Sequence, residues 1–255
     1  SNTYCSLANN GFYCSVQGTV SQCCIQDKGY FDQPNWNDVD NLEQYYKTNP
    51  KLQAVRNALD AGEQHPACET CWAYERNGQI SKRQRHNLAA DTTISFLDLR
   101  LTNKCNLMCK MCSSTLSSQW KDHGEKLQES HGIDTVNKKY KPSNYDLDQM
   151  LELVLQSPNI KQIRFAGGEP FIMPEVEKFI TALVDENKTH IELDFITNVT
   201  TVKPKLFDML QQFDRTTVNC SIDGVGEELE YQRYPVKWNT VDKNFRAIWA
   251  YRGPT

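Results

Sequence analysis

From about residue 94 onward, the apolar positions of the chain alternate between two spacings. Short runs rich in β-branched and aromatic residues, such as Gln162–Ala166, are typical of buried strands. Between these runs, apolar residues recur at helical spacing, and Pro174 opens one such segment. Strands that alternate with helices of this length predict parallel strands joined by right-handed crossovers. The expected strands are Ile94–Leu101, Gln162–Ala166, His190–Thr197 and Thr217–Ile222, and the expected helices cover Ser113–His123, 147–155, 174–184, Pro204–Phe213 and Val241–Tyr251.

The first 90 residues have a different pattern. Two short β-like runs, Phe12–Gln17 and Thr19–Ile25, flank Gly18 and predict a hairpin. Asn49 followed by Pro50 predicts the start of a helix, because the two residues suit the N-cap and the first helical position. The sequence therefore predicts a small cysteine-rich α+β module at 1–90 and an α/β domain at 91–255.

Composition narrows the class of protein. Charged residues make up 24% of the 255 residues and the net charge is −4. These values argue against a protein whose whole surface attracts nucleic acid. No apolar run approaches the roughly 20 residues that cross a bilayer, and the first residues lack a signal-peptide pattern. Ten cysteines without an export signal indicate a reducing compartment, where thiols bind metals more often than they pair. We therefore expect a cytoplasmic protein with no membrane partner.

Three cysteines lie close together after the first expected strand of the α/β domain. Cys105, Cys109 and Cys112 fall within eight residues. Thiolates are the usual ligands of iron–sulfur clusters, and three ligands would leave one iron with an open, reactive position. A structural zinc site would want a second Cys/His pair, and no histidine lies within ten residues of this loop. A disulfide framework suits small secreted chains. The spacing therefore favours a reactive iron–sulfur cluster.

Polar and glycine residues end the other expected strands of this domain. Functional residues of β/α barrels gather at the C-terminal ends of the strands. The second strand ends in Gly167-Gly168-Glu169-Pro170, where two residues without Cβ let a ligand approach the backbone. The third strand ends at Asn198, and the fourth leads into Ser221 and Asp223. These strand ends are therefore candidate ligand contacts.

These motifs resemble those of the radical S-adenosylmethionine (radical SAM) enzymes. The three cysteines are similar to the CxxxCxxC signature of that superfamily, and Gly167–Pro170 is similar to its GGEP motif. The resemblance implies a partial parallel β/α barrel of six units. Only about four units can be identified before Thr255, so we expect a barrel truncated at its C-terminal end, either a fragment or a fold completed in another way.

The resemblance also implies cofactors, partners and site residues. A 4Fe–4S cluster would bind SAM, cleave it reductively to a 5′-deoxyadenosyl radical and so remove a hydrogen atom from a substrate, which could be a peptide or protein. An external one-electron donor such as flavodoxin or ferredoxin would reduce the cluster. The cluster ligands, also counted as catalytic, would be Cys105, Cys109 and Cys112, and SAM would contact Met111, Gly167, Gly168, Glu169, Pro170, Asn198, Ser221 and Asp223.

The cysteines of the first 90 residues resemble the auxiliary-cluster module called twitch, a short form of the SPASM domain. The pattern there is Cys, Gly-x4-Cys, a gap and CxxC, and four cysteines hold a second 4Fe–4S cluster. Position by position, the ligands here would be Cys5, Cys23, Cys68 and Cys71, although the module precedes the catalytic domain instead of following it. Zinc bound by the same four thiols is an alternative. Cys24 is an alternative ligand to Cys23.

Two other functions remain open at this point. A non-catalytic iron–sulfur or zinc protein could transfer electrons or brace a partner, and metal content separates this case from an enzyme. A nucleic-acid-binding module would use the basic residues at 82–86 and 138–141, but the net acidity of the chain argues against it.

Overall fold

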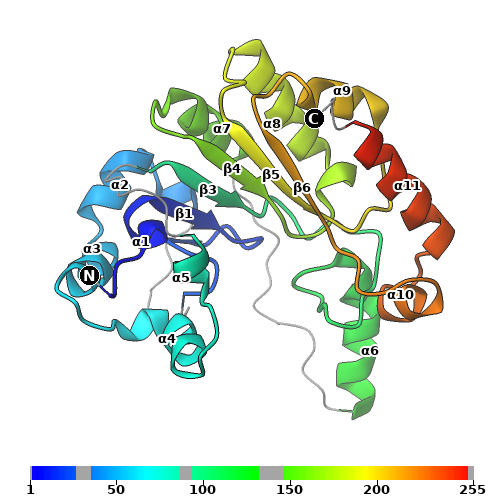
Figure 1. Cartoon of the computed structure of the whole chain (residues 1–255), viewed down its shortest axis with the longest axis horizontal. Helices are drawn as coiled ribbons and strands as arrows, with labels where there is room; N and C mark the ends of the chain where they lie inside the picture. The colour runs from blue at the N-terminus through cyan, green and yellow to red at the C-terminus, as the bar shows by residue number, and fades with distance from the viewer. Residues whose placement is uncertain (1, 27–35, 87–93, 132–145, 252–255) are drawn as a thin grey trace. The chain divides into compact units, whose positions relative to one another are not determined.

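A computed structural model describes residues 2–26, 36–86, 94–131 and 146–251 (Figure 1). The chain divides into two compact units. The first unit comprises Ser1–Asp98 with Tyr145–Ile163, and the second comprises Leu99–Asn144 with Arg164–Thr255. The expected domain boundary at residues 90/91 lies outside the described residues. Among the helices that the structure describes, none has the length and apolar character needed to span a membrane.

The first unit combines short helices with a β-hairpin and the edge of a sheet. In it β1 lies between β2 and β3, and β4 follows β3. Its elements are α1 (Ser6–Asn10), β1 (Gly11–Cys14), β2 (Val20–Ser21), η1 (Trp36–Asp38), α2 (Leu42–Thr48), α3 (Pro50–Asp60), η2 (Pro66–Cys68), α4 (Glu69–Arg76), α5 (Lys82–Arg85), most of β3 (Phe96–Leu99), α7 (Leu147–Gln156) and the start of β4 (Gln162–Phe165).

The structure confirms the predicted hairpin and the predicted helix start in the first unit. Strands β1 and β2 pair antiparallel, and Gly18 takes a positive φ of 76° in the turn between them. Helix α3 begins at Pro50, and the Asn49 side chain accepts hydrogen bonds from the backbone N–H groups of the first turn. Its apolar face, Leu52, Val55 and Leu59, is buried. Local sequence signals therefore determine both elements.

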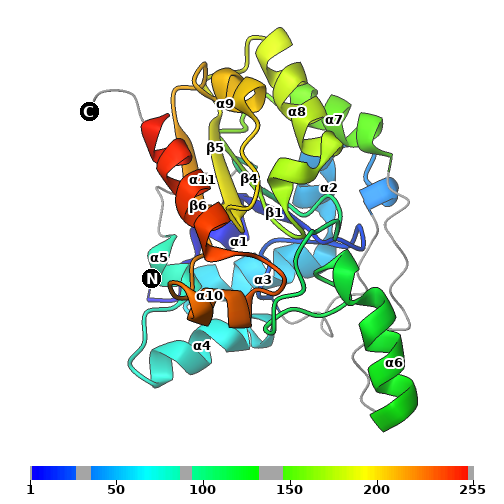
Figure 2. The ribbon, with the colours of Figure 1, turned by 90° about the vertical axis from the view of Figure 1, so that its right-hand side faces the viewer.

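The second unit is a β/α arrangement in which β5 lies between β4 and β6 (Figures 1 and 2). Strands β5 and β6 run parallel, with Leu193 opposite Thr216 and Thr197 opposite Cys220. Parallel neighbours require crossover connections, and α9 supplies the one between these two strands. The elements of this unit are η3 (Ser118–Trp120), α6 (Lys121–His131), the end of β4, η4 (Pro170–Ile172), α8 (Pro174–Asp185), β5 (Glu192–Thr197), α9 (Pro204–Leu210), β6 (Thr216–Cys220), α10 (Glu227–Gln232) and α11 (Trp238–Ala250).

The two faces of the sheet in the second unit differ in chemistry, because successive residues of a strand point to opposite faces. Phe165 and Phe195 stack with ring centroids 5.4 Å apart, and Phe165 also contacts Phe179 of α8. Their neighbours Arg164 and Asp194 form a largely buried ion pair with nitrogen and oxygen 2.5 Å apart. The apolar face is thus covered by helices, whereas the opposite face carries charged side chains.

The predicted helix Ser113–His123 is wrong in its first half. Residues 113–117 form turns, and the α-helix α6 begins only at Lys121, after the short 3₁₀ helix η3. The Ser117 side chain accepts a hydrogen bond from the Gln119 N–H, and its own hydroxyl donates to the Leu107 carbonyl at 2.6 Å. A serine whose side chain binds nearby backbone competes with helix formation. The basic residues at 138–141 lie outside the described residues.

The turn after β4 lies against the chain that leaves β3. Gly168 has a positive φ of 53°, and a Cβ built on it would meet the Lys104 carbonyl oxygen and lie 2.9 Å from the Asn103 carbonyl carbon. Only a residue without a side chain fits this close approach in this backbone conformation.

We predict that Gly168→Ala destabilises the protein more than Gly62→Ala. Both glycines have positive φ, but a Cβ at Gly62 would meet nothing within 4 Å. The left-handed backbone alone costs an alanine about 1–2 kcal/mol, and overpacking at Gly168 adds roughly 1–3 kcal/mol. Urea unfolding followed by circular dichroism measures both free energies of unfolding. Equal losses for the two variants would contradict the close approach.

Candidate functional site

The loop that follows β3 carries three thiols that interact with one another. Cys109 is buried, and Cys105 and Cys112 are partly buried. The thiol of Cys109 donates a hydrogen bond to Cys112, which lowers the pKa of Cys112 to about 7 and raises that of Cys109. Burial raises the pKa of Cys105, and the Leu107 N–H, 3.5 Å from its sulfur, opposes this rise. The structure therefore brings together the three predicted cluster ligands.

A segment far along the chain holds the cysteine loop from one side. The Met108 N–H donates to the Tyr234 carbonyl at 2.7 Å, and the Lys110 N–H donates to the Gln232 carbonyl at 2.9 Å. The two bonds are two residues apart on both segments, and they join the loop to the end of α10 and the chain that follows it. Backbone hydrogen bonds of this kind fix the path of a loop that has no regular secondary structure.

The turn at 167–170 lies next to the cysteine loop, as the position of Gly168 indicates. The Glu169 N–H donates to the Lys104 carbonyl at 2.8 Å. The Glu169 side chain is fully buried, and its carboxylate accepts hydrogen bonds from the Thr197 hydroxyl (2.7 Å), the Asn198 N–H (2.6 Å) and the Phe171 N–H (3.1 Å). Burial raises the pKa of Glu169, although these three donors favour the ionised form. Glu169 therefore ties the turn to the end of β5.

Asn198, at the end of β5, also reaches the cysteine loop. Its Nδ2 donates to the Asn106 Oδ1 at 2.9 Å and points toward the Cys105 sulfur at 3.8 Å. Its Oδ1 accepts from the backbone N–H and the hydroxyl of Thr200. The Asn198 amide is thereby fixed in orientation, with a donor directed at a thiol.

The remaining predicted residues lie on the tip of β6 and on the rim of the loop. The Ser221 N–H donates to the Thr197 carbonyl at 2.8 Å. Asp223 accepts from Arg233 at 2.6 Å, and another nitrogen of Arg233 lies 3.8 Å from the Cys109 sulfur. The Met111 side chain is 52% exposed. The site set predicted from sequence omitted Arg233, because its contact with Cys109 depends on how α10 folds back.

Four cysteines of the first unit line a common cavity. Cys5, Cys23, Cys68 and Cys71 all contribute to its wall, together with the Arg83 side chain. Burial raises the pKa of Cys5 and raises that of Cys68 to about 12, whereas the charge of Arg83 acts to lower both. These are the four thiols that the sequence predicts as auxiliary ligands.

Cys24 does not line this cavity and has a different environment. The ammonium of Lys82 lies 2.8 Å from its sulfur and 3.9 Å from the carboxylate of Asp98. A hydrogen bond from Cys23 lowers the pKa of Cys24 to about 6, and Lys82 contributes to this decrease. Cys14, on β1, is buried, and its thiol points to the Ser15 carbonyl.

The spacing of the thiols differs from that of ligands around a single ion. Among the residues that the structure describes, no three His, Cys, Asp or Glu side chains converge closely enough to hold one metal ion. The thiolates of a four-iron cluster bind different irons and so lie farther apart than the ligands of one ion.

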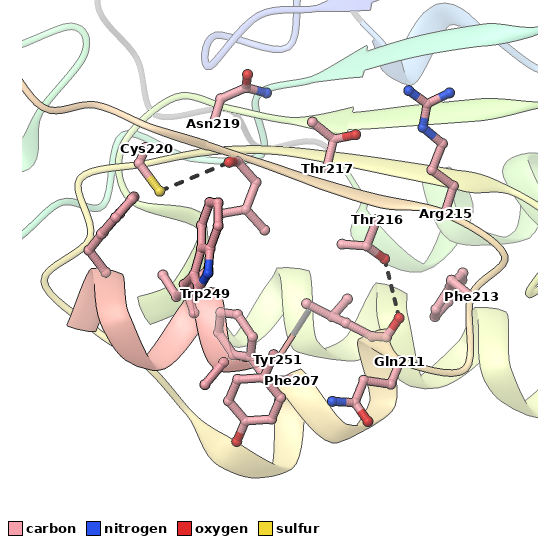
Figure 3. A pocket seen from close by; sticks show the side chains of 15 residues that line it. Phe207, Gln211, Phe213, Arg215, Thr216, Thr217, Asn219, Cys220, Trp249 and Tyr251 are labelled. Carbon is pink, nitrogen blue, oxygen red and sulfur yellow. Dashed lines mark hydrogen bonds between the residues drawn. The ribbon is translucent and has the colours of Figure 1, made fainter. Parts of the chain in front are cut away.

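A cavity of about 1180 Å³ follows β6 and lies beside α9 and α11 (Figure 3). Phe207, Trp249 and Tyr251 contribute aromatic side chains to its wall, and Thr216 and Cys220 contribute from the strand. None of the residues predicted to bind a cluster or SAM lines it. This cavity was not foreseen from the sequence.

Comparison with known proteins gives the family. The model of the Radical SAM superfamily matches residues 99–252. GTP 3′,8-cyclase of Campylobacter lari is 26% identical over 139 residues, which cover 54% of this chain and 38% of that protein. Radical SAM cyclopropyl synthase TigE of Paramaledivibacter caminithermalis is 23% identical over 135 residues, which cover 52% of this chain and 28% of TigE. The matches thus span less than half the length of these two relatives.

A solved structure described as native anSMEcpe with bound AdoMet also resembles the chain. It is 21% identical, covers 62% of this chain and 41% of its own, and has a TM-score of 0.43. Since the family match extends over more than half of the chain, the protein belongs to the radical SAM superfamily of enzymes, a family that implies a 4Fe–4S cluster and S-adenosylmethionine.

Proposed function

We propose that Cys105, Cys109 and Cys112 bind the 4Fe–4S cluster of a radical SAM enzyme and that the strand ends around them bind SAM. The observation that carries this proposal is the set of hydrogen bonds that joins the cysteine loop to the other strand ends. The Glu169 N–H donates a hydrogen bond to the Lys104 carbonyl, and the Asn198 side chain donates one to the Asn106 side chain. Three ligands for four irons leave one coordination position for SAM.

The side chains near the thiols suit such a cluster. Thiolates bind metals only when deprotonated, and the charge of Arg233 acts to lower the pKa of both Cys109 and Cys112. The amide of Asn198 and the guanidinium of Arg233 direct N–H donors at the sulfurs of Cys105 and Cys109. Donors aimed at cluster sulfurs stabilise their negative charge.

The proposed SAM contacts are Met111, Gly167–Pro170, Asn198, Ser221 and Asp223. At the turn, Gly168 lets the backbone pass close to Lys104 and so brings the turn to the cysteine loop. Three donors to the Glu169 carboxylate fix the turn, and the ammonium group of SAM is the ligand that we propose for it.

Cys105, Cys109 and Cys112 would hold the cluster, which would supply one electron for the cleavage of SAM into methionine and a 5′-deoxyadenosyl radical, and this radical would remove a hydrogen atom from the substrate. The protein residues hold SAM in a fixed orientation and keep the radical from side reactions. Reduction by an external donor such as flavodoxin or ferredoxin remains part of this proposal. A peptide or protein substrate is proposed from the resemblance of the four-cysteine module to twitch and SPASM enzymes.

We also propose that Cys5, Cys23, Cys68 and Cys71 hold a second, auxiliary 4Fe–4S cluster. Their common cavity supports this assignment. We leave Cys24 out of the proposed ligand set, because its sulfur contacts Lys82 and Cys24 does not line the cavity. Four thiolates would leave no iron of this cluster open to a substrate, so we propose electron transfer as its role. Zinc at the same thiols is the competing assignment.

We predict that Cys105→Ala abolishes the cleavage of SAM. After anaerobic reconstitution and reduction with dithionite, the wild-type protein should bind about eight irons and form 5′-deoxyadenosine, and the variant should bind about four. Chromatography of the reaction and iron analysis measure the two quantities. Cys14→Ala is the control, because this buried thiol lies at neither site. This variant should bind as much iron and form as much 5′-deoxyadenosine as the wild-type protein.

Retention of 5′-deoxyadenosine formation by Cys105→Ala would refute the proposed ligand set. A wild-type protein that binds eight irons but forms no 5′-deoxyadenosine would instead favour a non-catalytic electron carrier.

A second prediction concerns the adjacent cysteines of the auxiliary site. Cys23→Ala should lose about four of eight irons, because it removes a thiol from the cavity wall. Cys24→Ala should keep all of them, because Lys82 holds that thiol away from the cavity. Iron analysis and the visible absorption of the reconstituted proteins test this difference. The reverse result would make Cys24 the ligand, and about one zinc per chain at this site would favour the structural alternative.

A further inference from the structure

The Arg83 side chain forms part of the wall of the four-cysteine cavity and is fixed by contacts on several sides. Its Nε and Nη2 donate to the two carboxylate oxygens of Glu75 at 3.1 and 2.6 Å. Its Nη1 donates to the Tyr4 carbonyl at 2.8 Å, and the guanidinium carbon lies 4.8 Å from the ring centroid of Trp72. Only 10% of the side chain is exposed.

Local structure around Arg83 explains why the guanidinium keeps this position. Ser81 and Gln84 form a capping box that starts α5, the helix that carries Arg83. The Ser81 hydroxyl also donates to Glu75 at 2.5 Å. Glu75 is therefore held from two directions, and a bidentate carboxylate in turn orients the planar guanidinium.

The ion pair between Arg83 and Glu75 is asymmetric with respect to the cavity. Arg83 lines the cavity, whereas Glu75 does not. Of the five N–H donors of a guanidinium, two have no bond to Glu75 or Tyr4 in this arrangement. The positive end of the pair thus lies at the cavity wall.

We propose that Arg83 raises the reduction potential of the iron–sulfur group assigned to the four-cysteine cavity. This inference rests on the proposed auxiliary cluster. A one-electron reduced cluster carries one more negative charge than its oxidised form, and a fixed cation beside it stabilises that charge. The potentials of iron–sulfur clusters depend on net charge, on hydrogen bonds to sulfur and on solvent exposure. Arg83 contributes the positive charge, and its side chain helps to close the cavity wall.

A second cation of this region, Lys82, contacts other groups. Its ammonium lies 2.8 Å from the sulfur of Cys24, which lies off the cavity wall, and 3.9 Å from the buried carboxylate of Asp98. Lys82 does not line the cavity, so Arg83 is the cation of the cavity wall whose removal tests the inference.

The experiment measures the midpoint potential of the auxiliary cluster in a protein that lacks the other one. Cys105, Cys109 and Cys112 are replaced by alanine, and the remaining cluster is titrated with dithionite and followed by electron paramagnetic resonance. The variants are Arg83→Gln, Arg83→Lys, Glu75→Gln and Arg85→Gln. Arg85 lies on the same helix and is exposed, so its variant is a matched loss of charge at the surface.

Arg83→Gln should lower the equilibrium constant for electron uptake about tenfold, which is 59 mV for a one-electron couple. Arg83→Lys should keep most of the potential, because it keeps the charge. Glu75→Gln should raise the potential, because it removes the compensating carboxylate. Arg85→Gln should leave the potential unchanged. If Arg83 had a purely structural role, Arg83→Gln and Glu75→Gln would not change the potential in opposite directions.

Several outcomes would overturn the inference. An iron-loaded Arg83→Gln protein with the wild-type potential would do so, as would a decrease in potential in both Arg83→Gln and Glu75→Gln. Loss of iron from both Arg83 variants together with an unchanged potential in Glu75→Gln would make Arg83 a structural residue. Metal analysis of the parent protein separates these results from a failure of the proposed function: zinc in place of iron would refute the auxiliary cluster itself.

Discussion

The buried carboxylate of Glu169 is the interaction on which the geometry of the second unit depends. An ionised group without solvent is costly to bury unless hydrogen bonds compensate it. Glu169 receives one such bond from within its own turn and two from the end of β5. Its backbone N–H also donates a hydrogen bond to the carbonyl of Lys104, where the chain enters the cysteine loop. A single residue therefore connects the ends of three strands, and the thiols take their positions relative to this connection.

The two groups of cysteines are built on different physical principles. The three thiols of the second unit lie in an irregular loop whose position is fixed by backbone hydrogen bonds to the carbonyls of Gln232 and Tyr234 and by donors from Asn198 and Arg233. The four thiols of the first unit instead come from separate short elements around one cavity, and the ion pair of Arg83 closes part of the wall. The loop of the second unit suits an open site that a ligand can enter. The cavity of the first unit suits an enclosed site.

The sequence predicts those features that depend on local chemistry. Asn49 and Pro50 start a helix, Gly18 forms a hairpin turn, and the Gly-Gly pair at 167–168 permits a close approach, each for reasons that its neighbours in sequence supply. The cysteine spacing indicates a cluster because one loop can present all three thiols. Long-range contacts could not be predicted in the same way. The contact of Arg233 with Cys109 depends on the fold of α10.

Three other features of the structure have no signal in the sequence pattern. The orientation of Arg83 depends on Glu75 of the preceding helix and on the ring of Trp72, and neither contact leaves a pattern in the sequence. Residues 145–163 join the first unit although they follow the cysteine loop in sequence. The turns at 113–117 arise from one serine side chain that binds backbone, which helical periodicity does not reveal.

The two backbone hydrogen bonds from Met108 and Lys110 have a consequence for biosynthesis. Their acceptors, the carbonyls of Tyr234 and Gln232, belong to a segment that the ribosome makes long after the thiols have emerged. Contacts between such distant segments form late, because closing a long loop has an entropic cost that must be met first. The nascent chain therefore exposes three unrestrained thiols during translation, and their final arrangement waits for α10.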